Sequence, residues 1–282
     1  MGFRLKIEYW DIEGEKTMEK KIRIATVGDN CMDVYDKDGK VFPGGNPINV
    51  AVYVKRLGGD SCYVGAVGTD PYGQQMIDAI KGKDVDVSHI KVLEGNTAVT
   101  HVEIINGDRV FGDYEEGVMA DFKIDEEDIE FLCGYDLVVS GIWGMVEKEL
   151  PQIRAKGIPV AFDFATEKDH PVIDIAIPYV DYAFFADDAA SEEEIKEFMK
   201  KMHARGPKVV TVTRGGEGSI AYDGENFYKF GIVPCEVVDT MGAGDSFIAG
   251  FLYSICAGKT IPEAMADGAA NSSVTIAYSG AW

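Results

Sequence analysis

The sequence predicts an α/β fold in which a mostly parallel sheet is covered by helices on both faces. Short apolar runs alternate with segments of helical periodicity along most of the 282 residues, and a single hairpin signal interrupts this alternation. Hydrophobic residues make up 46% of the chain, which is ample material for a core. No internal repeat or low-complexity linker is visible, so we expect one large domain.

Strands are predicted where apolar residues run together between turn residues. These segments are 22–28, 61–68, 136–142, 159–165, 181–186 and 208–215. Helices are predicted where apolar residues recur every three or four positions. In segment 46–58, Ile48, Val52 and Leu57 share one face and Gly58 can end the helix. The other predicted helices are 72–83, 147–156, 190–204, 244–257 and 262–278.

Residues 97–114 break the pattern, because two alternating runs flank Asn106-Gly107, a dipeptide typical of a tight hairpin turn. A hairpin inserted in a parallel α/β chain is expected to stand off the main sheet. We therefore predict a small β lid formed by about 32–45 and 95–118, in which 35–42 pairs with the hairpin. Residues 1–20 are predicted to be an N-terminal extension of uncertain role or an additional edge strand.

The composition excludes several classes of function. The 48 acidic and 27 basic residues give a formal charge of -21, which repels nucleic acid and anionic membranes. The five cysteines form no CxxC pair and the four histidines are scattered, so we predict no disulfide framework and no metal ligand from the protein. The N-terminus lacks an apolar signal core and no apolar stretch is long enough to span a bilayer, so we expect a soluble, cytoplasmic protein.

The strongest chemical signal is DTMGAGDSFIAGF, which runs from Asp239 to Phe251. Gly242, Ala243 and Gly244 permit a tight turn that opens a helix, so unpaired amides and the helix dipole face the same point. Such donors stabilise the negative charge of a phosphoryl group in transfer. Asp245 stands in the first turn of that helix, where it can accept the proton of an attacking hydroxyl. On its own, a GxGD motif would indicate only a capped helix start, because short glycine motifs recur by chance. The longer string is highly specific and therefore favours a site for phosphoryl transfer.

Other polar or glycine-rich segments follow predicted strands. GDNCMD contains Asp29 and GGNPIN contains Gly44, Gly45 and Asn49. Residues 213–218 include Thr213, Gly215 and Gly218, and the last predicted helix contains Asn271. Taken singly, the first three segments read as ordinary turns and Asn271 as an exposed helix residue. These simpler interpretations do not explain why the segments occur together and in this order along the chain.

From Lys21 to Trp282 these strings resemble the ribokinase-like (PfkB) carbohydrate kinases. The resemblance implies a three-layer α/β/α kinase domain over 21–282 with a β lid, and ATP with Mg²⁺ as cofactors. It implies that Asp29, Asn49 and the Gly44-Gly45 backbone bind the sugar. Thr213, Gly215 and Gly218 would line the nucleotide, and Asn271 would lie near adenine.

One family motif is missing. Many members carry NxxE after a central strand, whereas this chain has FFADDAASEEE, from Phe184 to Glu194. Asp187, Asp188 or Asp163 are candidates to substitute, or water and ATP hold the magnesium. Some relatives also bind a monovalent cation through loop carbonyls, which here would be those near Asp239 and Met241. The sequence leaves open whether this chain does so.

The strings GDNCMDVY, DRVFGDYEEGVMADF, IWG, FDF and SGAW resemble the fructoselysine 6-kinase branch of the family. This implies phosphorylation of a fructosamine, most simply fructoselysine at its 6-hydroxyl. Arg109, Tyr114 and Trp143 are candidates to contact the substrate. Glu115 and Glu116 are candidates to attract its amine, or they are solvated charges of the loop. A kinase of a plain sugar such as fructose or ribose, and a nucleotide-binding sensor without turnover, are the alternatives.

The expected partners are a small sugar and ATP, with no nucleic acid and no membrane. A lid strand with a free edge is a candidate surface for a homodimer, through 35–42 or 97–114.

Overall fold

The structure is a computed structural model that describes residues 21–35, 37, 39–105 and 108–282. The described residues form two sheets, of which the larger has nine strands in the order β13-β12-β11-β10-β9-β8-β1-β4-β5. Their bounds are β1 Arg23–Val27, β4 Asp60–Gly68, β5 Ile90–Leu93, β8 Leu137–Gly141, β9 Val160–Asp163, β10 Tyr182–Ala186, β11 Val209–Thr213, β12 Ser219–Tyr222 and β13 Phe227–Phe230. The strands from β5 to β11 pair in parallel, and β12 and β13 add to the sheet in antiparallel fashion.

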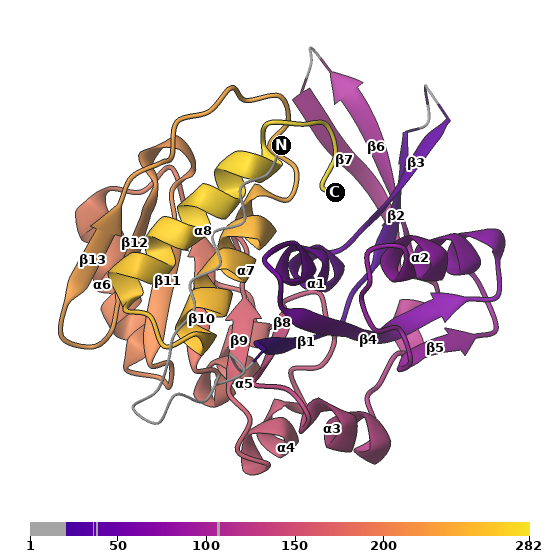
Figure 1. Cartoon of the computed structure of the whole chain (residues 1–282), viewed down its shortest axis with the longest axis horizontal. Coiled ribbons are helices and arrows are strands. Elements are labelled where there is room, and N and C mark those ends of the chain that lie inside the picture. The colour runs from indigo at the N-terminus through magenta and orange to yellow at the C-terminus, as the bar shows by residue number, and fades with distance from the viewer. Residues whose placement is uncertain (1–20, 36, 38, 106–107) are drawn as a thin grey trace, which may run out of the picture.

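Helices cover both faces of this sheet, as Figure 1 shows. Their bounds are α1 Asn46–Arg56, α2 Pro71–Lys81, α3 Glu126–Leu132, α4 Leu150–Ala155, α5 Val172–Ala176, α6 Glu192–His203, α7 Ala243–Cys256 and α8 Ile261–Thr275. One hydrophobic cluster joins α1, α7 and α8 to one face, and another joins the helices from α3 to α6 to the other face. The predicted three-layer α/β/α fold is confirmed.

The predicted strands and long helices are present within a few residues of their expected bounds. The sequence prediction omitted β5, β12, β13, α3 and α5. Each of these has only four to seven residues, which is too short for a clear periodic signal. The edges of the sheet and two short helices were therefore the parts of the fold that the pattern missed.

A second sheet is formed by four strands in the order β3-β2-β6-β7. Their bounds are β2 Cys31–Tyr35, β3 Lys40–Gly44, β6 Val99–Ile105 and β7 Asp108–Glu115. β6 and β7 pair antiparallel, and β2 joins this pair by parallel pairing with β6. The expected turn residues 106–107 and the N-terminal residues 1–20 lie outside the described residues. Figure 1 shows this sheet projecting away from the larger one.

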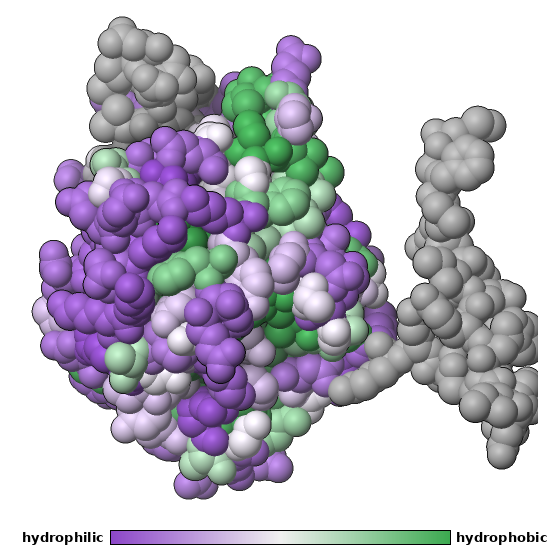
Figure 2. Space-filling model, turned by 90° about the vertical axis from the view of Figure 1, so that its left-hand side faces the viewer, coloured by the Kyte–Doolittle hydropathy of each residue, from purple (hydrophilic) through white to green (hydrophobic). Residues whose placement is uncertain are grey.

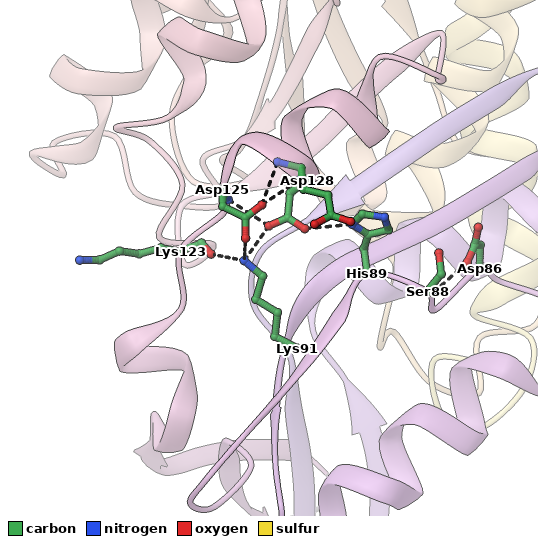
Figure 3. A network of polar contacts seen from close by, with 8 residues as sticks. Asp86, Ser88, His89, Lys91, Lys123, Asp125 and Asp128 are labelled. Carbon is green, nitrogen blue, oxygen red and sulfur yellow. Dashed lines mark hydrogen bonds and ion pairs between the residues drawn. The ribbon is translucent and has the colours of Figure 1, made fainter.

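A polar network ties the edge strand β5 to the start of α3 (Figure 3). The Lys91 ammonium lies 2.8 Å from Asp125 Oδ2 and 2.7 Å from Asp128 Oδ2. Asp128 also contacts His89 Nδ1 at 3.0 Å. The hydrogen bond from Lys91 lowers the pKa of Asp125 to about 2, so the network persists over the ordinary pH range.

The surface is largely polar. In Figure 2, hydrophilic side chains cover most of the face shown. Within the described residues, no helix is long and apolar enough to cross a membrane.

Helices α7 and α8 approach each other closely through two glycines. A Cβ added at Gly250 would lie 2.8 Å from the carbonyl oxygen of Asp267, and one added at Gly268 would lie 2.9 Å from that of Phe247. A Cβ atom does not approach a carbonyl oxygen this closely, so the helices can pack at this distance only because both residues lack a side chain. The pair fixes the position of α7.

We predict that Gly250→Ala lowers the free energy of unfolding by about 1–3 kcal/mol, because the added methyl forces the two helices apart. The sign is informative, since alanine is otherwise the better helix former by roughly 1 kcal/mol. Chemical denaturation measures the change. Gly244→Ala in the same helix is the matched control, because a Cβ there meets no atom within 4 Å. Equal stability of the two variants would contradict the packing argument.

Candidate active site

A cleft of about 1230 Å³ lies between the second sheet and the helix starts near the carboxyl ends of the parallel strands. Its lining comes from several elements and includes many of the predicted site residues. The lining residues are Asp29, Asn30, Cys31, Asp33, Gly44, Gly45, Asn46, Asn49, Thr100, Gly112, Tyr114, Trp143, Val237, Val238, Asp239, Thr240, Met241, Gly242, Asp245 and Ser279. Ligands bind at this edge of parallel sheets because strand ends and helix starts converge there.

The predicted Gly-Ala-Gly turn does open a helix. Gly242 adopts a φ of 71° and caps α7, and Asp245 stands in the first turn. Within the described part of the chain, the backbone N–H groups of Gly244 and Asp245 have no acceptor in the protein. Unpaired amides at the positive end of a helix form a site that favours an anion.

Two asparagines on the first turn of α1 hold Asp245. Asn46 Nδ2 donates to Asp245 Oδ1 at 2.6 Å, and Asn49 Nδ2 donates to Asp245 Oδ2 at 2.7 Å. Residues spaced three apart on a helix lie on the same face, so both amides point at one carboxylate. Asn46 Nδ2 also donates to Asp163 Oδ2 at 2.9 Å, at the end of β9. The two asparagines therefore connect three segments that are far apart in sequence.

Three acidic groups share this region, and each has a raised pKa. Burial raises the pKa of both Asp29 and Asp163 to about 7, and the nearby Asp245 charge adds to the effect. Burial also raises the pKa of Asp245, against the opposing hydrogen bonds from Asn49 and Asn46. Perturbed carboxyl groups gathered in a cleft are typical of a catalytic site.

The glycines before α1 permit close approach of two backbone segments. Gly45 has a φ of 116°, and a Cβ there would lie 2.8 Å from Asn30 Cα. At Gly44 a Cβ would lie 2.9 Å from Asp33 Oδ2. The loop that contains Asp29 can therefore pack directly against the start of α1, which places Asp29 in the same cleft as Asn49 and Asp245.

The second sheet and the loop after β8 contribute aromatic rings. Tyr114 on β7 and Trp143 both line the cleft, and about half of each side chain is exposed. Arg109 lies in β7, but its side chain is outside the described residues. Glu115 and Glu116 do not belong to the lining, and Glu115 lies 3.8 Å from His101.

The residues predicted for the nucleotide lie apart from this lining. Thr213 ends β11, and Gly215 and Gly218 form the turn that leads into β12. This turn stands at the carboxyl end of a parallel strand, on the same edge of the sheet as Asp163. Their role in nucleotide binding stays a prediction.

Asn271 has partners within the protein. Its Nδ2 donates to the carbonyl of Ser246 at 2.8 Å, and its Oδ1 accepts from Arg56 at 2.7 Å. With 6% exposure it is buried, so the alternative of an exposed helix residue is wrong. Each end of the amide therefore has a partner within the protein, and the position of Asn271 near adenine stays a prediction.

Several cleft residues were not predicted from the sequence. Asn46 stands within GGNPIN, and its spacing from Asn49 was an available signal. Asp33 stands within GDNCMD and also lines the cleft. Val237 and Val238 line it from a loop without periodicity, and both are more than half exposed.

Two of the acidic residues that could replace the NxxE motif, Asp187 and Asp163, have different surroundings in the structure. Asp187 pairs with Lys168 and accepts hydrogen bonds from the backbone N–H groups of residues 189 and 190. Asp163 lies at the site through Asn46. Among the residues that the structure describes, no group of three or more His, Cys, Asp or Glu side chains is suited to hold a metal ion.

Comparison with known proteins agrees with this geometry. The family model for pfkB family carbohydrate kinases matches residues 21–282. A fructoselysine 6-kinase from Shigella flexneri is 48% identical over 259 residues, covering 92% of this chain and 99% of that protein. A fructosamine kinase from Bacillus subtilis is 36% identical and covers 93% of both chains. The structure of Arabidopsis thaliana ribokinase complexed with ribose and ATP has a TM-score of 0.84 at 22% identity, and covers 92% of this chain and 94% of that one.

We predict that Asp163→Asn changes the pH dependence of stability. With a folded pKa of about 7 and an ordinary value of 3.8, Asp163 keeps its proton in the folded state while the unfolded chain loses it. The wild-type protein therefore loses stability as the pH rises from about 4 to 7, and the asparagine variant lacks this loss. Denaturation at several pH values should show the variant gaining about 1–4 kcal/mol relative to wild type across that window, and no more above it.

Asp60→Asn is the control of opposite sign. The hydrogen bond from Lys21 lowers the pKa of Asp60, so this carboxylate stabilises the folded state above its pKa and its removal should cost stability as the pH rises. A constant difference between Asp163→Asn and wild type at every pH would show that Asp163 does not titrate abnormally.

Proposed function

Because this chain belongs to the pfkB family of carbohydrate kinases, we propose that it transfers the γ-phosphoryl group of ATP to the 6-hydroxyl of fructoselysine or a closely related fructosamine. The substrate class follows the relatives that are named for fructoselysine and fructosamine. A kinase of a plain sugar is the alternative, and the experiments below distinguish the two.

The observation that carries the substrate proposal is the charge of the cleft. Its described lining includes Asp29, Asp33, Asp239 and Asp245 but no Lys, Arg or His. An anionic sugar would need a cationic partner there, whereas a fructosamine brings a protonated secondary amine of its own. A donor-only cation suits a lining of carboxylate acceptors.

Asp29 is the best placed partner for that amine. It is 9% exposed, and its Oδ1 has no hydrogen-bond partner in the described structure. A buried acceptor without a donor is costly unless a ligand supplies one. The cation would also favour the ionised form of a carboxyl group whose pKa is about 7 in the free protein.

In the proposed reaction, Asp245 accepts the proton of the attacking hydroxyl as the new oxygen–phosphorus bond forms and the bond to the ADP oxygen breaks. Asn46 and Asn49 hold both of its carboxylate oxygens in place. The unpaired N–H groups of Gly244 and Asp245 would bind the negative oxygens of the group in transfer. All of these elements meet at the start of α7.

The nucleotide is proposed to extend from this point toward the turn at 213–218 on the same edge of the sheet. When bound, Mg²⁺ would neutralise negative charge on the phosphates. The described residues contain no group of three or more His, Cys, Asp or Glu side chains that could hold a metal, which fits an ion whose ligands are mainly water and ATP oxygens. Four further points stay predictions: closure of the second sheet over the sugar, a monovalent cation near Asp239 and Met241, a cytoplasmic location, and a homodimer through 35–42 or 97–114.

We predict that Asp245→Asn lowers kcat by about 10²–10⁴-fold, because the amide cannot accept the proton. The assay is coupled ATP turnover with Mg²⁺ and fructoselysine, fructose, ribose or no sugar. Asp174→Asn, in the first turn of α5 with a largely exposed side chain, is the matched control and should retain activity. Full turnover by Asp245→Asn would rule out its role as the base, and preference for a plain sugar would exclude the fructosamine assignment.

We predict further that Asp29→Asn raises KM for fructoselysine by about 10–100-fold, because a hydrogen bond to a charged partner is worth roughly 1.5–3 kcal/mol. Turnover of fructose, which lacks the amine, should change far less, since asparagine can still bond to hydroxyls. Glu116→Gln is the control for loop charge outside the cleft lining. An equal loss for both sugars would show that Asp29 does not recognise the amine.

A further inference from the structure

The chain returns to the cleft after α8. The backbone N–H groups of Val238 and Asp239 both donate to the carbonyl of Ile276, at 2.8 and 3.2 Å. Gly280 N donates to Asp239 Oδ2 at 2.8 Å. Figure 1 shows this segment running from α8 toward the second sheet, above α1. Residues 276–282 are therefore fastened to the loop that precedes α7.

Tyrosines fix the end of this segment. Tyr53 Oη, on α1, donates to the carbonyl of Ala281 at 2.6 Å, and Tyr278 Oη donates to the same oxygen at 3.0 Å. The Trp282 ring packs against two of the hydrophobic clusters, and the Lys83 ammonium lies 5.4 Å from its centre. The ring is thus held in place by both clusters, each of which includes residues of α1.

The polar edge of that ring meets a cleft residue. Trp282 Nε1 donates to Asn49 Oδ1 at 2.8 Å, and Asn49 Nδ2 donates to Asp245 Oδ2 at 2.7 Å. An indole N–H is only a donor and a carboxylate is only an acceptor. Rotating the Asn49 amide by half a turn would therefore place donor against donor and acceptor against acceptor.

We propose that Trp282 is a positioning residue that fixes the orientation of the Asn49 amide, and through it the carboxylate of Asp245. The proposal rests on the assignment of Asp245 as the base. Without the indole donor, the amide is free to turn its oxygen toward Asp245. That orientation removes one of the two hydrogen bonds that favour the ionised carboxylate, so ionisation requires a higher pH.

The test is Trp282→Phe, which keeps an aromatic ring and removes the N–H. We expect kcat to fall about 3–30-fold, the acid limb of the pH profile to move to higher pH, and KM for ATP to stay constant. Tyr278→Phe is the matched control, because it removes the two hydrogen bonds that Tyr278 Oη makes with Ala281 and Arg56, without touching Asn49. A merely structural role would affect both variants alike and would leave the pH profile in place.

A double-mutant cycle with Asn49→Ala separates coupling from general damage. Trp282→Phe should have little further effect on kcat in that background, whereas multiplicative losses would overturn the proposal. Should Trp282→Phe fold poorly, two-dimensional ¹H–¹⁵N spectra of Asn49→Ala provide an independent measurement. The Trp282 indole resonance should shift when its acceptor is lost, and an unchanged resonance would also overturn the proposal.

The outcomes distinguish this inference from the proposed function. If Asp245→Asn retains activity, the assignment of the base fails, and the proposal fails with it. If Asp245→Asn is inactive but Trp282→Phe matches Tyr278→Phe, only the role of Trp282 is wrong.

Discussion

The site depends on the contact between the first turns of α1 and α7. Two side-chain amides of α1 grip the carboxylate at the start of α7, and one of them also holds the carboxyl group at the end of β9. Partial burial makes ionisation of both acidic groups unfavourable, and the hydrogen bonds from the amides compensate part of that cost. The contact therefore sets both where the Asp245 carboxylate lies and how readily it takes up a proton.

The surrounding fold holds these two helix starts in place. The α7–α8 contact through glycines fixes one helix, and the glycines before α1 let the other pack against the loop after β1. The parallel strands bring the third partner, Asp163, to the same edge. This arrangement makes the cleft acidic, because it brings carboxylates to the described lining without Lys, Arg or His beside them.

Local motifs were enough to predict which residues meet where α1 and α7 begin. The Gly-Ala-Gly-Asp string predicted the helix start, because the string specifies its own turn, and the family resemblance of GGNPIN singled out Asn49, which the structure places against Asp245. The link from Asn46 to Asp163 depends on which strands are neighbours, which no local pattern encodes. The bond from Trp282 to Asn49 joins residues 233 positions apart, so only the folded chain brings them together. Short edge strands were missed because four residues carry too little periodicity.

Gly242 shows how closely these parts are interlocked. A Cβ at this position would lie 2.2 Å from Tyr53 Oη, and that hydroxyl holds Ala281 beside Trp282. A side chain at this turn would thus displace the tyrosine that anchors the returning segment. Loss of activity in a Gly242 variant would therefore not by itself show that this turn binds phosphate, because the same substitution also displaces the returning segment.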